Sequence, residues 1–302
     1  MELDAPVFIE RVEVHNREDE FAYRAWSAVL ETSTDNLDWD LVFDHREREQ
    51  RFLELARSLS IGGLPAASAP SVAEVILAAL RSPAELTDRL DRLKHEFAPE
   101  LRNVVARTLN ADFMAGMGVE ITTHGLTKTF RFWTDRDKDE YLFSATRIIK
   151  ALDAGNHASF VSFGTLLGIV RDGDFIPHDD DIDISVVVEA VSDDDLKGKM
   201  LVVRSSLQSA GLNCYGDHDF HFHAAFGEAK PVDLFFMRRT GDSCFVRPAR
   251  SARVGLGQVF PLGKTTFRGV EVPVPADALG FLRHVYGDDW RTPRPSFEHT
   301  GW

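Results

Sequence analysis

The chain of 302 residues has few of the features that mark secreted or membrane-spanning proteins. It contains only two cysteines, Cys214 and Cys244, which are too few for a disulfide framework or a cysteine-rich zinc site. No apolar run approaches the roughly 20 residues that span a bilayer. The sequence opens without a basic segment followed by an apolar one, so we expect no signal peptide. These absences favour a soluble cytoplasmic protein without a transmembrane segment.

Positive charge is also scarce. The sequence has 34 Lys and Arg against 48 Asp and Glu, which gives a formal net charge of −14. Because affinity for a nucleic-acid backbone comes mainly from Lys and Arg, we expect no nucleic-acid partner. An acidic protein can still bind a nucleotide if metal ions lie between its carboxylates and the phosphates.

Several motifs of well-known enzymes and sensors are absent. The sequence has no GxxxxGK[ST] phosphate loop, no HExxH and no GxSxG. The spacing of Asp179, Asp181 and Asp183 imitates the first three ligand positions of an EF-hand loop. However, Ile184 stands where that loop needs glycine, and Ala190 where it needs glutamate. We therefore set aside P-loop enzymes, zinc proteases, α/β-hydrolases and calcium sensors.

The chain divides into two parts by its patterns. We expect residues 1–130 to form a mostly helical region of unknown role, because SVAE at 71–74 and SPAE at 82–85 are typical of helix starts. Residues 131–302 alternate helix and strand patterns, which predicts an α/β (α+β) domain with a small mixed sheet. The expected elements are a helix from Thr134 to near Gly155, an apolar run at 160–163, a short helix from Thr165, a strand at 181–188, a helix from Ser192 towards Gly211, and strands at 218–226 and 232–237.

Carboxylates gather where the 181–188 strand is expected to begin. Residues two apart on a strand face the same side at about 6.6 Å. Asp181 and Asp183 are therefore expected to point together and to hold Mg²⁺, with Mn²⁺ as an alternative and Asp179 as a further ligand. Asp233 lies in the apolar strand at 232–237, where a carboxylate must be paired, metal-bound or protonated. The alternative interpretation of the cluster is a solvated acidic turn that runs into a strand.

Other residues suggest a phosphate-binding position. Gly164 and Thr165 stand where a strand ends and a helix begins, where amides and the helix dipole receive a phosphate. Arg171 lies at the far end of this helix and could bind a phosphate with its planar guanidinium, or be a surface arginine. A group of three histidines, His218, His221 and His223, could form a zinc site or contact a bound nucleotide. Their alternation with phenylalanines favours an ordinary amphipathic strand.

The run from Gly164 to Ile184 resembles the signature of the LicD/fukutin family, GTLLGxVRxGxFIPxDDDIDI. Near the C-terminus, FRGVEVPVP at 267–275 and YGDDW at 286–290, with Pro293, are similar to the closing F-x-G-x-x-x-x-x-P and Y-G-x-x-W elements of that family. The resemblance covers roughly residues 135–295. His178 stands where the family commonly has Trp, and Asp172 and Asp174 replace residues that are often His and Gly. The cysteine zinc site of fukutin-type members has no counterpart in this sequence.

The resemblance implies a nucleotidyltransferase-type fold and a LicD-type phosphotransferase. Such an enzyme moves a phospho-alcohol (phosphocholine, phosphoethanolamine or a polyol phosphate) from a CDP-activated donor to a hydroxyl of a glycan or glycoconjugate. Asp181, Asp183 and Asp233 would hold Mg²⁺, and Asp233 would also help deprotonate the acceptor. Two alternatives remain: a nucleotidyltransferase that moves a nucleoside monophosphate from an NTP to a small molecule or protein, and a non-catalytic nucleotide-binding scaffold.

Overall fold

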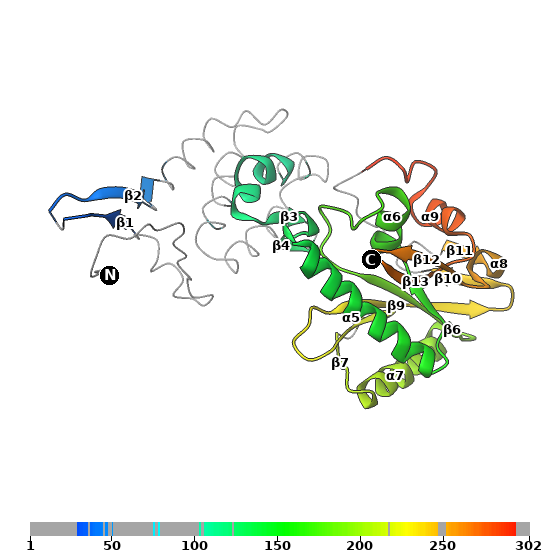
Figure 1. The fold of residues 1–302 in the computed structure, drawn as a ribbon. Helices are drawn as coiled ribbons and strands as arrows, with labels where there is room; N and C mark the ends of the chain where they lie inside the picture. Colours follow the sequence, from blue (N-terminus) through cyan, green and yellow to red (C-terminus); the bar gives the residue numbers. More distant parts are fainter. Residues whose placement is uncertain are drawn as a thin grey trace. The chain divides into compact units, whose positions relative to one another are not determined.

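The computed structural model describes residues 29–35, 37–44, 46, 47, 50, 75, 78, 103, 106–122, 124–216, 218–246 and 252–293. The chain forms two compact units, Met1–Thr127 and Lys128–Trp302 (Figure 1). The helix starts expected at 71–74 and 82–85 lie outside the described residues. The candidate site lies wholly in the second unit.

The described part of the first unit contains two hairpins and several helical turns. Strand β1 (Val29–Thr32) pairs antiparallel with β2 (Asp40–Asp44), and β3 (Glu120–Thr122) pairs with β4 (Gly125–Thr127). Two short turns, η3 (Asn110–Met114) and η4 (Ala115–Met117), precede the second hairpin. The side chain of Asn110 bonds both the N–H and the carbonyl of Ile121, so it ties η3 to β3.

The second unit is built on a seven-stranded mixed sheet. Its strands are β5 (Ser159–Val161), β6 (Asp183–Glu189), β7 (Asn213–Tyr215), β8 (His221–Ala225), β9 (Val232–Thr240), β10 (Ser243–Val246) and β11 (Ala252–Gly255). The main order is β11-β10-β9-β6-β5, and β8 joins β7 to β9. Only β6 and β9 pair in parallel among the described strands, and their register places Asp183 opposite Asp233. This arrangement confirms the α/β class with a mixed sheet.

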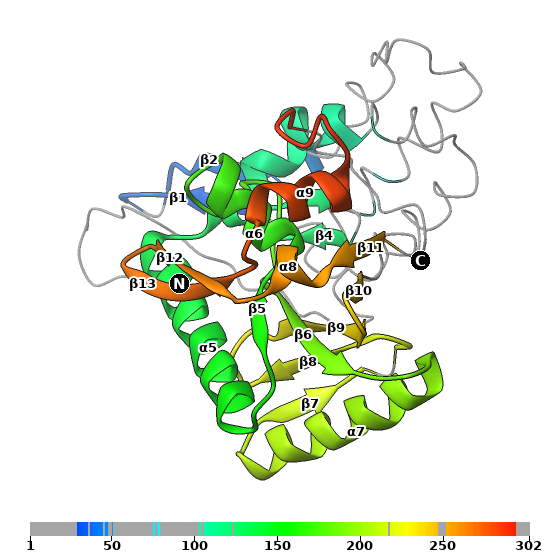
Figure 2. The same cartoon turned by 90° about the vertical axis from the view of Figure 1, so that its right-hand side faces the viewer.

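Helices cover the sheet in two groups. They are η5 (Phe130–Phe132), α5 (Asp135–Ala154), α6 (Phe163–Arg171), α7 (Asp193–Ser209), α8 (Leu256–Val259) and α9 (Ala278–Tyr286). Figure 2 shows α5 and α7 on one side of the sheet, with α6, α8, α9 and the β12–β13 hairpin (Gly263–Phe267 and Val270–Val274) on the other. Almost every residue of strand β6 is therefore buried, because both faces of the strand are covered.

Two predicted helix starts are confirmed by their caps. The Thr134 hydroxyl accepts from the N–H of Asp137, whose carboxylate accepts from the N–H of Thr134, so α5 begins with a capping box. Its C-cap is Gly155, as expected. The Ser192 hydroxyl likewise accepts from the N–H of Asp195 at the start of α7.

Two strand starts differ from the prediction. Strand β6 begins at Asp183 instead of Asp181, and β8 begins at His221 instead of His218. The late start of β6 is caused by the side chain of Tyr141, which is distant in sequence. The N–H of Ile182 donates to the phenol oxygen of Tyr141 at 3.1 Å, so this donor is not available to a neighbouring strand.

Tyr141 links α5 to both strands that carry carboxylates. Its buried hydroxyl also donates to the carbonyl of Pro231, just before β9. We expect Tyr141→Phe to lower the free energy of unfolding by about 1–3 kcal/mol, because it leaves two buried backbone groups without this partner. Urea unfolding would measure the change. Tyr215→Phe, at a tyrosine that is 44% exposed, is the control, and an equal loss in both variants would contradict the assigned role.

Candidate active site

Three carboxylates converge at the start of the parallel strand pair. Asp181, Asp183 and Asp233 each present an oxygen within 4.8 Å of the others. Asp183 and Asp233 face each other across the β6–β9 ladder, and Asp181 lies in the extended segment just before β6. The sequence pattern predicts Asp181 on the strand itself. The structure brings the three side chains together as expected, but Asp181 reaches the others from the segment before the strand.

The first turn of α6 holds Asp183. The N–H of Gly164 donates to Asp183 Oδ2 at 2.9 Å, and the N–H of Thr165 lies 3.4 Å from the same oxygen. In return the N–H of Asp183 donates to the Thr165 hydroxyl at 2.8 Å. We expected these groups to face a phosphate directly, but in the structure they bind a carboxylate. The positive end of the helix dipole favours that negative charge.

Gly164 is needed because carboxylates crowd its α-carbon. A Cβ at this position would lie 2.5 Å from Asp179 Oδ2 and 3.3 Å from Asp183 Oδ2. The preceding residue, Phe163, has φ 41°, an unusual left-handed conformation for an aromatic residue, and packs edge-on against Phe235. The chain thus makes a strained turn that brings the Gly164 amide against the acidic cluster.

Electrostatic repulsion within the cluster is strong. Burial raises the pKa of Asp183 well above its ordinary value, and Asp179 and Asp233 raise it further. Burial likewise raises the pKa of Asp181, with added repulsion from Asp179 and Asp183. Asp180 turns to a different partner, Lys230, whose ammonium lies 3.0 Å from its carboxylate. A divalent cation among the other carboxylates would offset their repulsion, so the donor set fits such an ion.

The C-terminal element reaches the same cluster. Burial raises the pKa of the Tyr286 phenol well above its ordinary value, and Asp183, Asp179 and Asp181 raise it further. Trp290 is only 4% exposed and belongs to the hydrophobic core. The segment that carries the second part of the family resemblance therefore lies within electrostatic reach of the carboxylates.

Arg171 and two of the three departures from the family pattern, Asp172 and Asp174, form ion pairs. The guanidinium of Arg171 binds Asp172 through two contacts of 2.8 Å. Asp174 accepts from Lys138 and from Arg268, each at 3.0 Å. The phosphate-binding role of Arg171 thus remains a prediction, and the structure pairs its side chain with the neighbouring carboxylate.

The sequence pattern favours an ordinary amphipathic strand for the three histidines, but the structure brings one of them, His223, into the site. His223 Nδ1 lies 2.6 Å from Asp233 Oδ1, directly across the β8–β9 ladder. Burial, followed by the neighbouring His218, lowers the pKa of His221 to about 4. The spacing of His221 and His223, two apart on a strand, was visible in the sequence. The pairing of their strand with the strand of Asp233 was not.

The mixed sheet and its carboxylate cluster lie within a region of the chain that a family model matches. The family model described as LicD/FKTN/FKRP, nucleotidyltransferase domain, matches residues 156–277, so this region belongs to the LicD family. The match includes α6, β6 and β9 and ends before Tyr286. LicD membership indicates transferase activity.

Other comparisons add little. No curated protein matches the chain. Among solved structures, ANT(2")-Ia in complex with adenylyl-2"-tobramycin is 15% identical, with a TM-score of 0.33 over 45% of this chain and 69% of that one. The lincosamide antibiotic adenylyltransferase LnuA, lincomycin-bound, is 14% identical, with a TM-score of 0.31 over 48% and 84% of the two chains. Within the described ranges, no helix has the length and apolar character needed to cross a membrane.

Proposed function

We propose that the protein is a LicD-type phosphotransferase that uses Mg²⁺, or Mn²⁺, to move a phospho-alcohol from a CDP-activated donor to a hydroxyl of a glycan or glycoconjugate. The observation that carries the proposal is the convergence of Asp181, Asp183 and Asp233 beside the first turn of α6, inside the region that matches the LicD family. The raised pKa values of Asp181 and Asp183 are the mark of carboxylates arranged for a purpose other than stability.

In this proposal the three converging aspartates hold the metal, and Asp179 adds a fourth carboxylate at its edge. The N–H groups of Gly164 and Thr165 hold one carboxylate oxygen of Asp183, which leaves the other oxygen available. A bound Mg²⁺ supplies charge neutralisation for the diphosphate of the donor. Arg171 would approach the phosphates only after leaving Asp172.

The proposed transfer is a single displacement at phosphorus. The acceptor hydroxyl oxygen forms a bond to the phosphorus that bears the alcohol, the bond from that phosphorus to the bridging oxygen breaks, and CMP leaves. Asp233 is the candidate that takes the hydroxyl proton, and its contact with His223 fixes the orientation of its carboxylate. Positioning supplies most of the rate enhancement in such a loose transition state.

The main rival reaction uses the same residues. There the α-phosphorus of an NTP is attacked and pyrophosphate leaves. Tyr286 supports the LicD-type reaction, because it lies within electrostatic reach of the carboxylates and belongs to the Y-G-x-x-W element that the resemblance links to that family.

Donor choice can be tested by melting curves and product analysis. With Mg²⁺ present, we expect a CDP-alcohol (CDP-choline, CDP-ethanolamine or CDP-ribitol) at 100 times its Kd to raise Tm by about 5–10 °C, and by more than any NTP does. CMP should then appear when an acceptor glycan is added. Pyrophosphate release from an NTP, with no response to any CDP-alcohol, would favour the rival. Nucleotide binding without either product would favour the scaffold.

A further inference from the structure

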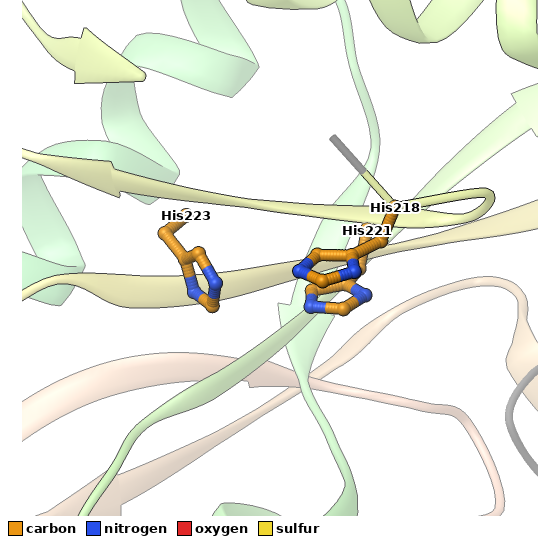
Figure 3. Close-up of side chains that lie close together, drawn as sticks. All are labelled: His218, His221 and His223. Atoms are coloured by element: carbon orange, nitrogen blue, oxygen red, sulfur yellow. The ribbon is translucent and has the colours of Figure 1, made fainter. Parts of the chain in front are cut away.

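Three imidazoles from β8 and the residues just before it lie together (Figure 3), and one of them contacts the acidic cluster at Asp233. His221 and His223 come from the strand itself, and His218 from the bend before it. The rings of His218 and His221 stack with centroids 4.1 Å apart, and the ring of His223 stands edge-on at 5.3 Å from His221. One nitrogen of each ring lies within 4.8 Å of the other two.

Neighbouring residues hold two of these rings in place. The ring of His221 stacks on the ring of Phe235, with centroids 5.1 Å apart, so one face of the imidazole packs against an apolar side chain. His223 is fixed by the 2.6 Å contact of its Nδ1 with Asp233, so a metal ion would bind the other ring nitrogen, Nε2. His218 is exposed and lies outside the strand, so its side chain is the one that can adjust.

We propose that His218, His221 and His223 form a binding site for a transition-metal ion, with Zn²⁺ as the best match. Three imidazoles with an open fourth position are a recurrent zinc ligand set, whereas Mg²⁺ prefers oxygen ligands. Tetrahedral Zn²⁺ at about 2.0–2.1 Å from each nitrogen needs nitrogens about 3.3–3.4 Å apart. The three nitrogens lie within 4.8 Å of one another, so the rings would have to move closer together to bind the ion, and the exposed His218 can move most easily.

The contact between His223 and Asp233 fixes the ring of His223 and links the proposed zinc site to the acidic cluster. Metal-bound histidines usually donate their second N–H to a carboxylate, which fixes the tautomer and the direction of the ring. Zinc on Nε2 of His223 would keep the proton on Nδ1, facing Asp233. The zinc site is distinct from the three-aspartate site, yet it would hold one oxygen of Asp233 in position.

Zinc titration of the metal-stripped, tag-free full chain tests this site. In competition with a chromogenic chelator, we expect the wild type to bind one equivalent tightly. His221→Ala and His223→Ala should weaken zinc binding by roughly 100-fold or more, a larger effect than loss of an outer partner. Asp183→Asn, which alters the acidic cluster, and His284→Ala, at an exposed histidine of α9, should bind zinc like the wild type. Co²⁺ bound to the wild type should show the intense visible bands of a tetrahedral site.

His218→Ala keeps the test decisive if replacement of the buried His221 prevents folding, because His218 is exposed. Wild-type zinc affinity no tighter than that of His218→Ala and His223→Ala would overturn the proposal. If Asp183→Asn lost zinc binding while the histidine variants kept it, the ion would belong to the aspartates and the proposal would be wrong. The measurement does not use turnover, so its failure would leave the proposed phosphotransferase reaction standing.

Discussion

Asp183→Asn is expected to reduce magnesium-dependent turnover by about 10³-fold or more and to raise the melting temperature of the metal-free protein. Activity falls because the variant loses one charge of the metal-binding set that positions the donor. Stability rises because Asp183 is buried and repelled by Asp179 and Asp233. The neutral amide keeps an oxygen that can accept from the Gly164 N–H. We expect a Tm increase of about 3–6 °C, or roughly 1–2 kcal/mol for a domain of this size.

The stabilisation should depend on pH in one direction. The folded-state pKa of Asp183 is raised, so the folded metal-free protein binds a proton more tightly than the unfolded chain does. The wild type therefore pays the cost of an ionised Asp183 in full above the raised pKa, and not at all below the unfolded value near 3.9. Melting curves in EDTA should show the advantage of the variant growing with pH and vanishing in acid. Added Mg²⁺ should raise the wild-type Tm only.

Asp195→Asn is the matched control. Asp195 is also an aspartate, in the first turn of α7, but its pKa is lowered, first by the backbone N–H of Val191 and then by Lys199. Its replacement should give no stabilisation and leave the magnesium response unchanged. If Asp183→Asn melted well below the wild type, and the wild type ignored Mg²⁺, Asp183 would be a structural residue and the proposed metal site would fail.

Local signals in the sequence predicted much of the second unit. The caps at Thr134 and Ser192 predict the starts of their helices. Each cap needs only a side chain and a backbone N–H three residues apart, so it is visible in the local sequence. The strand at 232–237 and its carboxylate could be predicted from the apolar run around Asp233, and the structure extends that strand to Thr240. The family resemblance, confirmed over residues 156–277, came from the signature at 164–184.

Contacts between distant segments were not predictable in the same way. No local pattern says that β8 pairs with β9, so the contact of His223 with Asp233 could not be foreseen. The start of β6 moves because Tyr141, 41 positions earlier, takes the N–H of Ile182. The unusual Asp174 is balanced by Arg268, 94 positions later. Each of these depends on tertiary packing that overrides the local pattern.

Gly164→Ala is expected to reduce magnesium affinity and turnover by about 100-fold or more while the domain stays folded. The added methyl would lie 2.5 Å from Asp179 Oδ2 and 3.3 Å from Asp183 Oδ2, so one or both carboxylates must move. A displacement near 1 Å in a preorganised site can cost about 10²-fold in rate. Thr165 would still hold the backbone of Asp183 through its hydroxyl, so the helix and strand should stay together. Magnesium titration and steady-state kinetics would measure the two losses.

Gly198→Ala separates this steric effect from the general effect of alanine in a helix. Gly198 lies within α7, and a Cβ there meets nothing within 4 Å. This variant should be stabilised by roughly 0.5–1 kcal/mol, because alanine loses less backbone entropy in a helix, and should keep wild-type metal affinity. If Gly164→Ala behaved like Gly198→Ala, with unchanged magnesium affinity, the carboxylates would not need to approach the α6 backbone. The acidic cluster would then be a solvated turn, and the proposed metal site would have to be abandoned.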